Sequence, residues 1–303
     1  MKQDLLTFGV WSPQQMQSLL ELAVHIKHHP ADYKNILAGR SVVALFEKPS
    51  LRTRVSFDIG INKLGGHLVY LDSHANSLAG REDIRDTAAN LACWADAIVA
   101  RVFSHHTLKT MADAANAPVI NALCDKYHPC QALADYLTLH EQFGAVKGRS
   151  LAYVGDGNNV THSLMIVGAL LGCNVLSVTP EGHSASPEIV ELAQTIAQQT
   201  GARIEKSYAI DAVKGVDVLY TDTWLSMGNK TPLAEIKEKF MPYQVNETLF
   251  AKSGARYIMH CQPVHRELEI TSRLIDSEAS LLMQQAENRM HGQNAILTHL
   301  LAK

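Results

Sequence analysis

Short apolar runs alternate along the chain with longer stretches whose hydrophobic residues recur at helical spacing. Several of the short runs, such as SVVALF at 41–46, are apolar at successive positions, which is typical of strands buried on both faces of a parallel sheet. The pattern predicts strands at Ser41–Phe46, His67–Leu71, Ala97–Ala100, Val119–Asn121, Leu151–Val154, Asn174–Thr179, Arg203–Lys206, Val216–Tyr220 and Tyr257–Met259.

The segments between these strands have the spacing of helices, and several are followed by glycine, which tolerates the positive φ of a helix end. Alternating strands and helices predict an α/β protein with parallel sheets. We expect helices at Leu51–Leu64, Pro129–Phe143, Val160–Leu171 and Pro187–Thr200, and a long last helix over roughly Ser277–Leu301.

A chain of 303 residues corresponds to two domains at about 150 residues each. The segment EQFGAVKGRS at 141–150 separates two such series of strands and helices, so we place the junction there. The prediction is two doubly wound parallel-sheet domains, at 1–145 and 146–280, and a C-terminal helix at 281–303 that crosses back to the first domain.

Polar or reactive residues closely follow six of the predicted strands, those that end near Phe46, Ala100, Asn121, Val154, Tyr220 and Met259. In open parallel sheets, ligands bind beyond the carboxyl ends of the strands. Two sheets that both carry such residues at this edge predict one active site in the cleft between the domains.

Composition excludes several classes of protein. The 27 Lys+Arg against 30 Asp+Glu give a net charge of −3, without the basic surplus of a general nucleic-acid binder. No stretch approaches the ~18 uninterrupted apolar residues of a membrane helix, and the N-terminus has no apolar signal core. Five widely spaced cysteines are not a disulfide framework. We therefore expect a cytoplasmic protein without membrane or nucleic-acid partners.

The segment FEKPSLRTRVSFD at 46–58 predicts an anion site. Ser50 occupies the N-cap position of the helix that follows Pro49, so the first turn presents N–H groups that lack helical acceptors. Arg52 and Arg54 lie beside these groups, and such a combination favours phosphate. The alternative is a surface helix with solvated arginines, but arginines in a first turn oppose the helix dipole, and a bound anion would offset that cost.

Five motifs resemble, in order and spacing, those of the aspartate/ornithine carbamoyltransferases. S-L-R-T-R at 50–54 resembles the family's S-T-R-T-R, and H-P-C-Q-A-L-A-D at 128–135 resembles H-P-x-Q-x-L-A-D. D-T-W-L-S-M-G at 222–228 resembles the ornithine-specific D-x-W-x-S-M-G, H-C-Q-P at 260–263 resembles H-C-L-P, and E-N-R at 287–289 is the family's E-N-R. Five motifs together are far more specific than one.

The resemblance implies that the first domain binds carbamoyl phosphate and the second ornithine, without cofactor or metal. It assigns carbamoyl phosphate to Ser50, Leu51, Arg52, Thr53, Arg54, Arg101, His128, Gln131, Cys261, Gln262 and Arg289. It assigns ornithine to Asn159, Asp222, Ser226 and Met227, and catalysis to Arg101, His128, Asp222 and Cys261. It also implies a homotrimer, or a multiple of trimers, with sites between subunits.

The residue types agree with a clamp on a phosphate and its carbonyl. His128 precedes Pro129, a favoured first helical residue, and the positive helix end would keep the ring neutral while a ring N–H points at a carbonyl oxygen. Gln131 in the same turn could reach that ligand. Taken alone, His128 could be a capping residue and Arg101 an ordinary ion-pair partner; with Arg52 and Arg54 they complete the clamp.

The G-D-G-N-N segment at 155–159 does not predict a dinucleotide site. Val160 stands where that fingerprint needs Gly or Ala, and no acidic residue ends the next strand. No G-K-[ST] follows, so a nucleoside-triphosphate loop is also excluded. The resemblance instead places Asn159 against the α-amino and carboxylate groups of the amino-acid substrate.

Asp222 is a carboxylate at a strand end that could neutralise an ammonium group, with hydrogen bonds from Ser226 and the Met227 backbone. The resemblance makes 222–228 an ornithine-recognition loop that closes over substrate. Cys261 could be a covalent nucleophile or a structural thiol. The family suggests a third role, which we prefer: contact with the δ-amine of ornithine without a covalent intermediate.

A zinc site at Cys124, His128 and Cys130 is not expected, because no C-x2-C or second ligand pair accompanies them. Two positions depart from the family. Gln262 replaces Leu, which is harmless if the residue acts through its carbonyl and alters affinity if its side chain intrudes. Ser77 stands where relatives offer Gln or His to a neighbouring subunit.

We therefore expect transfer of a carbamoyl group from carbamoyl phosphate to the δ-amine of L-ornithine. Two alternatives remain. The acceptor could be an acylated ornithine or another amine, against which the S-M-G segment argues. The chain could also be a catalytically silent regulatory or assembly subunit, against which Arg52, Arg54, His128 and Asp222 argue.

Overall fold

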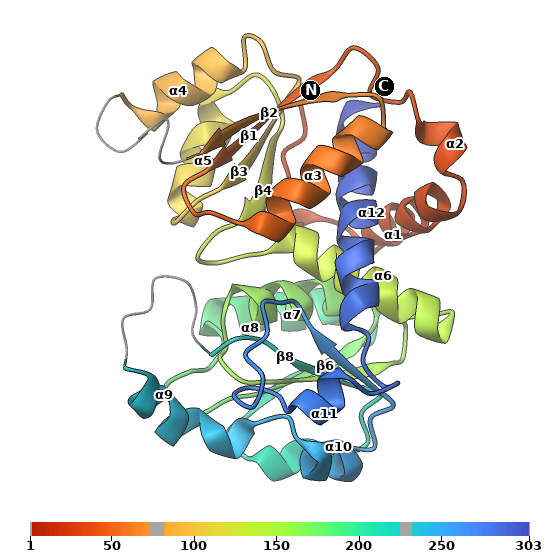
Figure 1. Ribbon diagram of the computed structural model, residues 1–303, viewed down its shortest axis with the longest axis vertical. Helices are drawn as coiled ribbons and strands as arrows, with labels where there is room; N and C mark the ends of the chain where they lie inside the picture. The colour runs from red at the N-terminus through yellow and green to blue at the C-terminus, as the bar shows by residue number, and fades with distance from the viewer. Residues whose placement is uncertain (1, 73–81, 225–231, 303) are drawn as a thin grey trace. The chain divides into compact units, whose positions relative to one another are not determined.

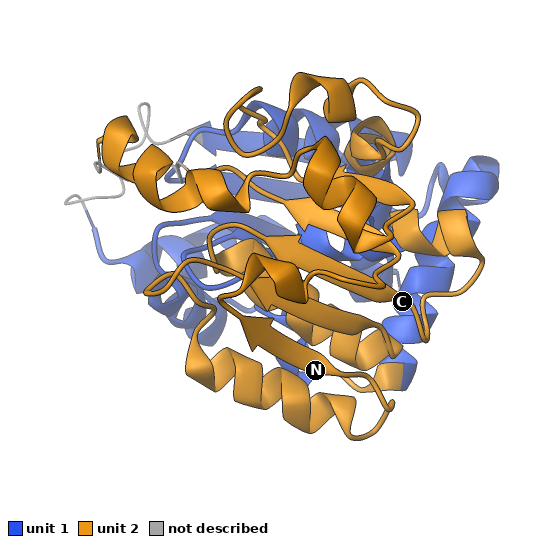
Figure 2. Cartoon of the chain, turned by 90° about the horizontal axis from the view of Figure 1, so that it is seen from below, with its two compact units in different colours: residues 1–10, 14–137, 288–303 blue, residues 11–13, 138–287 orange. Residues whose placement is uncertain are grey.

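The computed structural model describes residues 2–72, 82–224 and 232–302. The chain separates into two compact units (Figure 2). Unit 1 holds residues 1–10, 14–137 and 288–303, and unit 2 holds residues 11–13 and 138–287. Helices α6 (Pro129–Phe143) and α12 (Leu282–Leu301) each contribute residues to both units.

Unit 1 is built on a parallel sheet with the strand order β2–β1–β3–β4 (Figure 1). Its strands are β1 (Ser41–Phe46), β2 (His67–Asp72), β3 (Ala97–Arg101) and β4 (Val119–Leu123). All residues of β3 are buried, as expected of a central parallel strand with both faces covered. Its helical segments are η1 (Phe8–Val10), α1 (Pro13–His28), α2 (Pro30–Tyr33), α3 (Leu51–Lys63), α4 (Ile84–Leu91) and α5 (His105–Ala114).

Unit 2 is built on a second parallel sheet, with the order β7–β6–β5–β8–β9. Its strands are β5 (Ser150–Val154), β6 (Asn174–Val178), β7 (Ile204–Ser207), β8 (Val218–Thr221) and β9 (Tyr257–His260). Its helical segments are α7 (Asn159–Leu171), α8 (Pro187–Ala197), η2 (Ile210–Ala212), α9 (Leu233–Phe240), η3 (Met241–Tyr243), α10 (Glu247–Ser253) and α11 (Ser272–Ile275).

Helices cover both faces of the unit 2 sheet (Figure 1). Helix α7 packs on α8 and β6, and every residue from Val160 to Leu171 is buried. A helix that is apolar around its whole circumference lies in the interior, and this one has no polar side chain from Leu164 to Leu171. No described helix has the length and apolarity needed to cross a membrane.

Each sheet has a point at which the strand order reverses direction. In unit 1, the chain passes from β1 to β2 on one side of β1, and β3 then pairs with β1 on its other side. In unit 2, β6 and β8 lie in the same way on the two sides of β5. The loops after such strands diverge and leave a crevice that binds ligands in open α/β sheets. The expected site segments after Phe46, Arg101, Val154 and Thr221 all leave from these two points.

The structure confirms the predicted α/β class, with one parallel sheet in each unit, and contains a strand at each predicted position. The predicted start of the last helix, near Ser277, was wrong. The helix begins at Leu282. Residues 279–281 run instead along β9, where Ala279 accepts the N–H of Ile258 and Leu281 donates its N–H to Ile258.

Candidate active site

Helix α3 starts at the strand-order reversal of unit 1, and Ser50 caps it as the sequence predicts. The Ser50 hydroxyl accepts the N–H of Thr53 at 3.4 Å and donates to Thr53 Oγ1 at 2.9 Å. The backbone of Ser50 is extended, with φ −157° and ψ 108°. The first-turn N–H groups of α3 therefore lie at the carboxyl edge of the sheet, the arrangement that binds phosphate.

Arginines supply positive charge at the same edge. Arg52 and Arg54 are exposed, and the Arg54 guanidinium lies over the ring of Tyr70, 4.0 Å from its centroid, a cation–π contact that orients it. Arg101, at the end of β3, is 3% exposed. An anion at this edge would thus meet two guanidinium groups from the solvent side and one that is already desolvated.

Arg289 joins three of the predicted residues into one hydrogen-bonded cluster within unit 1. Its guanidinium donates to Thr53 Oγ1 at 3.0 Å, to His128 Nε2 at 3.1 Å and to the side-chain oxygen of Gln131. Gln131 in turn donates to Asp135 Oδ1 at 2.7 Å. Thr53, His128, Gln131, Asp135 and Arg289 are all buried, so these contacts form without competition from water and hold one another in place.

The pKa of His128 lies well below its ordinary value of 6.5, chiefly because the ring is buried and also because Arg289 and Arg101 are positive. The sequence predicted a neutral ring for a different reason, the helix dipole; burial is the larger cause. Since Arg289 can only donate, His128 Nε2 is an acceptor. The neutral ring therefore carries its proton on Nδ1, which is the N–H available to a carbonyl oxygen.

Lys48 is a residue of this region that sequence analysis did not select. Its pKa is lowered, first by burial and second by the charge of Arg101, and its ammonium group lies 4.5 Å from the centroid of the Phe103 ring. Sequence analysis could have selected Lys48 because it lies between β1 and the N-cap residue Ser50.

The second group of site residues meets at the strand-order reversal of unit 2. Asp222 follows β8 and is 5% exposed. Its Oδ2 accepts a hydrogen bond from Asn158 Nδ2 at 3.0 Å, and its Oδ1 accepts from the Cys261 thiol at 2.9 Å and from the N–H of Thr223 at 2.7 Å. The carboxylate is therefore held by donors from the loops that follow β5 and β9.

Asn158, a residue that sequence analysis did not select, contacts Asp222. The Asn158 side chain also caps α7, since its Oδ1 accepts the N–H groups of Val160 and Thr161 at 2.9 and 3.3 Å. Asn159 is the first residue of α7. Asparagine is favoured at the N-cap, and that preference could have pointed to Asn158.

Glycine is required in the loop that carries Asn158. A Cβ on Gly157 would lie 2.3 Å from the backbone nitrogen of Ala185 and 2.5 Å from the carbonyl oxygen of His183. The Gly157 N–H donates to that same carbonyl at 2.8 Å. The G-D-G-N-N pattern thus serves close backbone packing, and beside it the carboxylate of Asp156 pairs with His183 Nδ1 at 3.0 Å.

A buried His260–Glu269 pair supports the turn that carries Cys261. His260 Nε2 lies 3.1 Å from Glu269 Oε1, and its Nδ1 accepts the N–H of Gln262 at 2.8 Å. The side chains of His260 and Glu269 are 0% exposed. Gln262 has φ +58°, a region that costs energy for a residue other than glycine. The turn is thus fixed by a pair that sequence analysis did not select.

Asp222, His260 and Cys261 form the one group of at least three possible metal ligands within residues 2–72, 82–224 and 232–302. A carboxylate, an imidazole and a thiolate suit zinc in principle. Both ring nitrogens of His260 already have partners, Glu269 and the Gln262 N–H. The ring could not coordinate an ion without giving up one of these buried contacts, so the arrangement fits hydrogen bonding better than metal binding.

Three of the predicted site residues lie outside the described residues: Ser77, Ser226 and Met227. Leu51 is exposed at the first position of α3, and Gln262 takes part in the turn through its backbone N–H.

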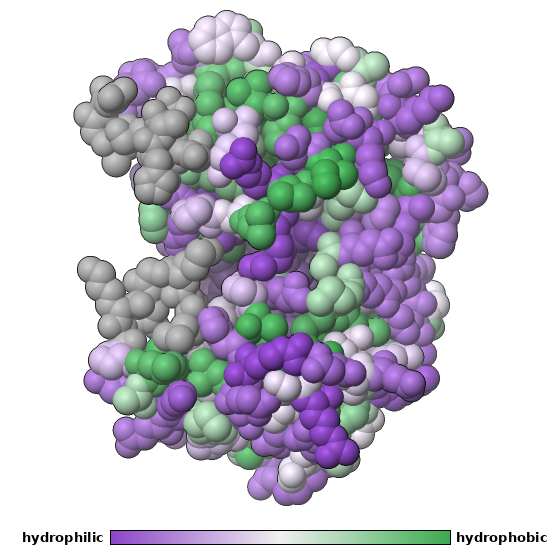
Figure 3. Space-filling view, viewed as in Figure 1, coloured by the Kyte–Doolittle hydropathy of each residue, from purple (hydrophilic) through white to green (hydrophobic). Residues whose placement is uncertain are grey.

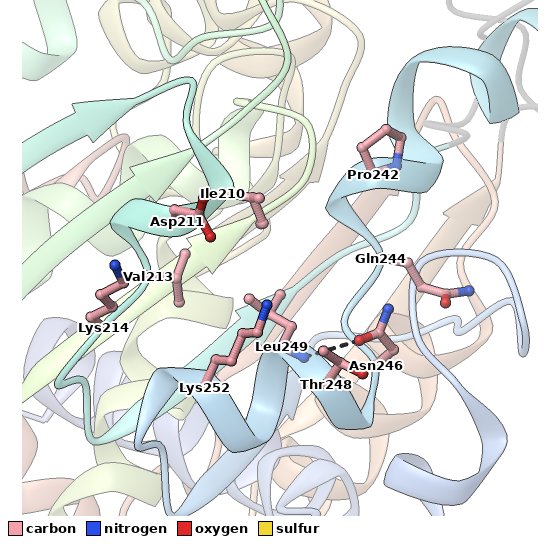
Figure 4. Close-up of a pocket in the computed structure, with 10 residues that line it drawn as sticks. All are labelled: Ile210, Asp211, Val213, Lys214, Pro242, Gln244, Asn246, Thr248, Leu249 and Lys252. Carbon is pink, nitrogen blue, oxygen red and sulfur yellow. Dashed lines mark hydrogen bonds between the residues drawn. The ribbon is translucent and has the colours of Figure 1, made fainter.

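Unit 2 also contains a pocket of about 570 Å³ that none of the predicted site residues lines (Figure 4). Figure 4 shows Leu249 and Lys252 of α10 facing Ile210 and Asp211, with Gln244 on the far side. Its lining contains none of the residues contacting Asp222, so we do not place the chemistry there.

The comparisons with known proteins cover both units. The model of the aspartate/ornithine carbamoyltransferase carbamoyl-P binding domain matches residues 3–141, and that of the Asp/Orn binding domain matches residues 147–300. An ornithine carbamoyltransferase of Vibrio sp. (strain 2693) is 54% identical over 299 residues, 99% of each chain. One from Shewanella oneidensis is 56% identical over 289 residues, 95% of this chain and 96% of that one.

The solved structures agree. Ornithine carbamoyltransferase from Pyrococcus furiosus has a TM-score of 0.94 at 42% identity, over 99% of this chain and 97% of that one. The fold and the matches define the protein as a transferase. The chain belongs to the aspartate/ornithine carbamoyltransferase family.

Proposed function

We propose that the protein transfers the carbamoyl group of carbamoyl phosphate to the δ-amine of L-ornithine, which yields L-citrulline and phosphate. The observation that carries the proposal is the cluster around Arg289, because it joins residues of three separate family motifs: Thr53 from the first, His128 and Gln131 from the second, and Arg289 itself from the third. The matching relatives named ornithine carbamoyltransferase support the choice of acceptor.

Carbamoyl phosphate would bind with its phosphate at the start of α3. The N–H groups at the very start of the helix and the side chains of Arg52 and Arg54 would hold the phosphate oxygens, and Gln131 would orient the carbamoyl amide. A helix N-terminus and guanidinium groups are strong anion donors. The capped geometry of Ser50 exists without ligand, so little reorganisation is required on binding.

Ornithine would bind to unit 2 through Asn159, Asp222, Ser226 and Met227. Asp222 is the charged group suited to an ammonium, and its carboxylate is already oriented by Asn158 and Cys261. The Cys261 thiol donates to Asp222, and this contact supports a role for Cys261 in positioning the carboxylate.

Asp222 and Cys261 would help position and deprotonate the δ-amine. The neutral amine would then attack the carbonyl carbon, and the C–O bond to phosphate would break as the C–N bond forms. The developing negative charge on the carbonyl oxygen would be stabilised by Arg101, the His128 Nδ1–H and the Thr53 hydroxyl. The proton lost by the amine would pass to the departing phosphate, which Arg52 and Arg54 hold. Orientation of the two substrates can contribute about 7–11 kcal/mol to lowering the barrier.

This chemistry requires the two substrates to meet. The sequence-based expectation of an active site in the cleft between the domains remains a prediction. Assignment of the two substrates to the predicted domains 1–145 and 146–280 remains a proposal as well.

We further propose that the protein is a homotrimer or a multiple of trimers, and an exposed apolar stripe on α3 supports self-association. Leu51, Val55 and Ile59 recur every four residues and are 75%, 43% and 47% exposed. Figure 3 shows a hydrophobic band over α3. Exposed apolar patches of this kind mark interaction sites, and the helix that carries this one also starts at the proposed phosphate site.

We propose a cytoplasmic location and a role in arginine biosynthesis. No disulfide joins any of the five cysteines, as expected in a reducing compartment. One matching relative, from Pyrococcus furiosus, is named an anabolic ornithine carbamoyltransferase.

The test is a turnover assay with the purified protein, carbamoyl phosphate and a panel of amines. L-ornithine should give citrulline and phosphate in equal amounts, and N-acetylornithine should react far more slowly. Preference for the acetylated amine would reassign the acceptor. Absence of turnover with every amine would favour the silent-subunit alternative.

A further inference from the structure

We propose a binding site for a divalent transition-metal ion on unit 1, formed by His25 and His29 at the end of α1, outside the residues proposed for carbamoyl transfer. These histidines are exposed and lie one helical turn apart. The His29 N–H donates to the His25 carbonyl at 2.8 Å, so the helical turn continues past the last residue of α1, His28.

The two imidazoles are close to a chelating geometry without any ion. Their ring centroids are 4.5 Å apart and their planes meet at 34°. A nitrogen–metal distance of about 2.0–2.1 Å places the centres of two neighbouring ligand rings about 5 Å apart. Small side-chain rotations therefore suffice for His25 and His29 to share one ion.

Tyr33 provides the outer hydrogen bond that metal-binding histidines usually have. Its phenol oxygen lies 2.9 Å from His25 Nδ1, and its ring packs edge-on against His25 at 5.6 Å. With the phenol oxygen as acceptor, the proton of the neutral ring stays on Nδ1 and the lone pair of Nε2 is left for a metal.

Charge and ligand type narrow the identity of the ion. The last turn of α1 lies at the negative end of the helix dipole, which favours a cation. The nearest lysine, Lys27, directs its ammonium group to Asn288 Oδ1 at 2.7 Å. Imidazole ligands select copper, nickel and zinc over magnesium and calcium. The site is thus suited to a divalent ion of that group, with water completing the coordination.

Calorimetric titration of the full protein with NiCl₂ alone, and separately with ZnSO₄ alone, tests the proposal. His25→Gln and His29→Gln should each lower the affinity of one site about 100-fold, because a two-ligand chelate becomes a single contact. Tyr33→Phe should lower it by up to about tenfold, as loss of an outer-shell partner does.

His28→Gln is the matched control, since His28 is an exposed histidine of the same turn without a ring contact to His25 or His29 among those described. It should leave the affinity unchanged. The titrations are repeated on Cys261→Ser, which removes one ligand of the Asp222–His260–Cys261 group. Three results would each overturn the proposal. The first is an equal loss of metal affinity in His28→Gln and His29→Gln, and the second is wild-type affinity in both His25→Gln and His29→Gln. The third is that Cys261→Ser abolishes metal binding at the site that these variants affect.

Discussion

The thiol of Cys261 donates a hydrogen bond to the carboxylate of Asp222 across 2.9 Å. The other oxygen of that carboxylate accepts from Asn158 at 3.0 Å. Asp222 is 5% exposed, so its negative charge is stabilised mainly by these donors and by the Thr223 N–H. Its orientation is therefore set before an ammonium group arrives.

Replacement of Cys261 by serine should weaken ornithine binding and leave part of the turnover. A hydroxyl can still donate to Asp222, but its shorter reach changes the position of the carboxylate. We expect the KM for ornithine to rise about tenfold, with a smaller fall in kcat. Steady-state citrulline kinetics measure both. Complete inactivation of the variant, together with a carbamoyl adduct trapped on the wild-type thiol, would establish covalent catalysis instead.

Replacement of Asn158 by aspartate separates its two contacts. The aspartate oxygen still caps α7, so the midpoint of thermal unfolding should fall only through the lost contact with Asp222. The donor to Asp222 is lost and a like charge takes its place. Loss of a hydrogen bond to a charged group costs about 2 kcal/mol, which predicts a fall in kcat/KM for ornithine of about 30-fold. An equal loss in Asn159→Asp, with Asn158→Asp close to wild type, would favour the sequence-based assignment.

Replacement of Arg54 by alanine should reduce citrulline formation at least about 100-fold, because the proposed phosphate loses a charged donor. The effect should appear in the KM for carbamoyl phosphate as well as in kcat. Arg203→Ala, at an exposed arginine beside β7, serves as the control. If the turnover of Arg54→Ala were close to that of the control, Arg54 would not be one of the residues that bind the phosphate.

The stability of the protein should depend on pH through His128. Its folded-state pKa lies below 6.5, so below that pH the unfolded chain binds a proton that the folded chain does not. Stability should therefore fall as the pH drops below the unfolded pKa, by up to about 1.4 kcal/mol per pH unit, until the folded pKa is reached.

Urea unfolding at fixed protein concentration from about pH 5 to about pH 8 measures this slope. His128→Gln should show a smaller slope than wild type over the acidic part of the range. The exposed His106 gives the control His106→Gln, whose slope should match wild type. Equal slopes for His128→Gln and wild type would mean that the buried ring titrates normally.

Replacement of Val55 or Ile59 by lysine should dissociate the proposed oligomer, because a charge on the α3 stripe would have to be desolvated at the interface. Sedimentation should then detect protomers at concentrations where wild type is assembled. Met283→Lys changes another exposed apolar residue, 70% exposed on α12, and should leave assembly unchanged. A monomeric wild-type protein would contradict the proposal directly.

Local signals were sufficient for the fold class and for the helix start at which we propose that phosphate binds. Successive apolar residues in β1 and β5 mark strands covered on both faces, and the capping preference of Ser50 marks the start of α3. These properties depend on residues a few positions apart. The five motifs likewise identified the family, since each is a contiguous run of the chain.

Long-range contacts could not be read from the sequence. The last helix starts at Leu282 because residues 279–281 pair with β9, which hydrophobic periodicity does not reveal. Asn158 contacts Asp222, 64 positions away, and no local pattern predicts that contact. The pairing of His260 with Glu269 requires both side chains to be buried together.

The sequence by itself determined the family, the α/β architecture and the residue types of the proposed anion site, because these follow from short-range patterns. Only the tertiary structure decided which side chains share a hydrogen bond. It brings Arg289 of α12 to Thr53, 236 positions away, and to His128, and it lowers the pKa of His128 by burial. Distances and desolvation depend on packing between distant segments, and packing is a property of the folded chain.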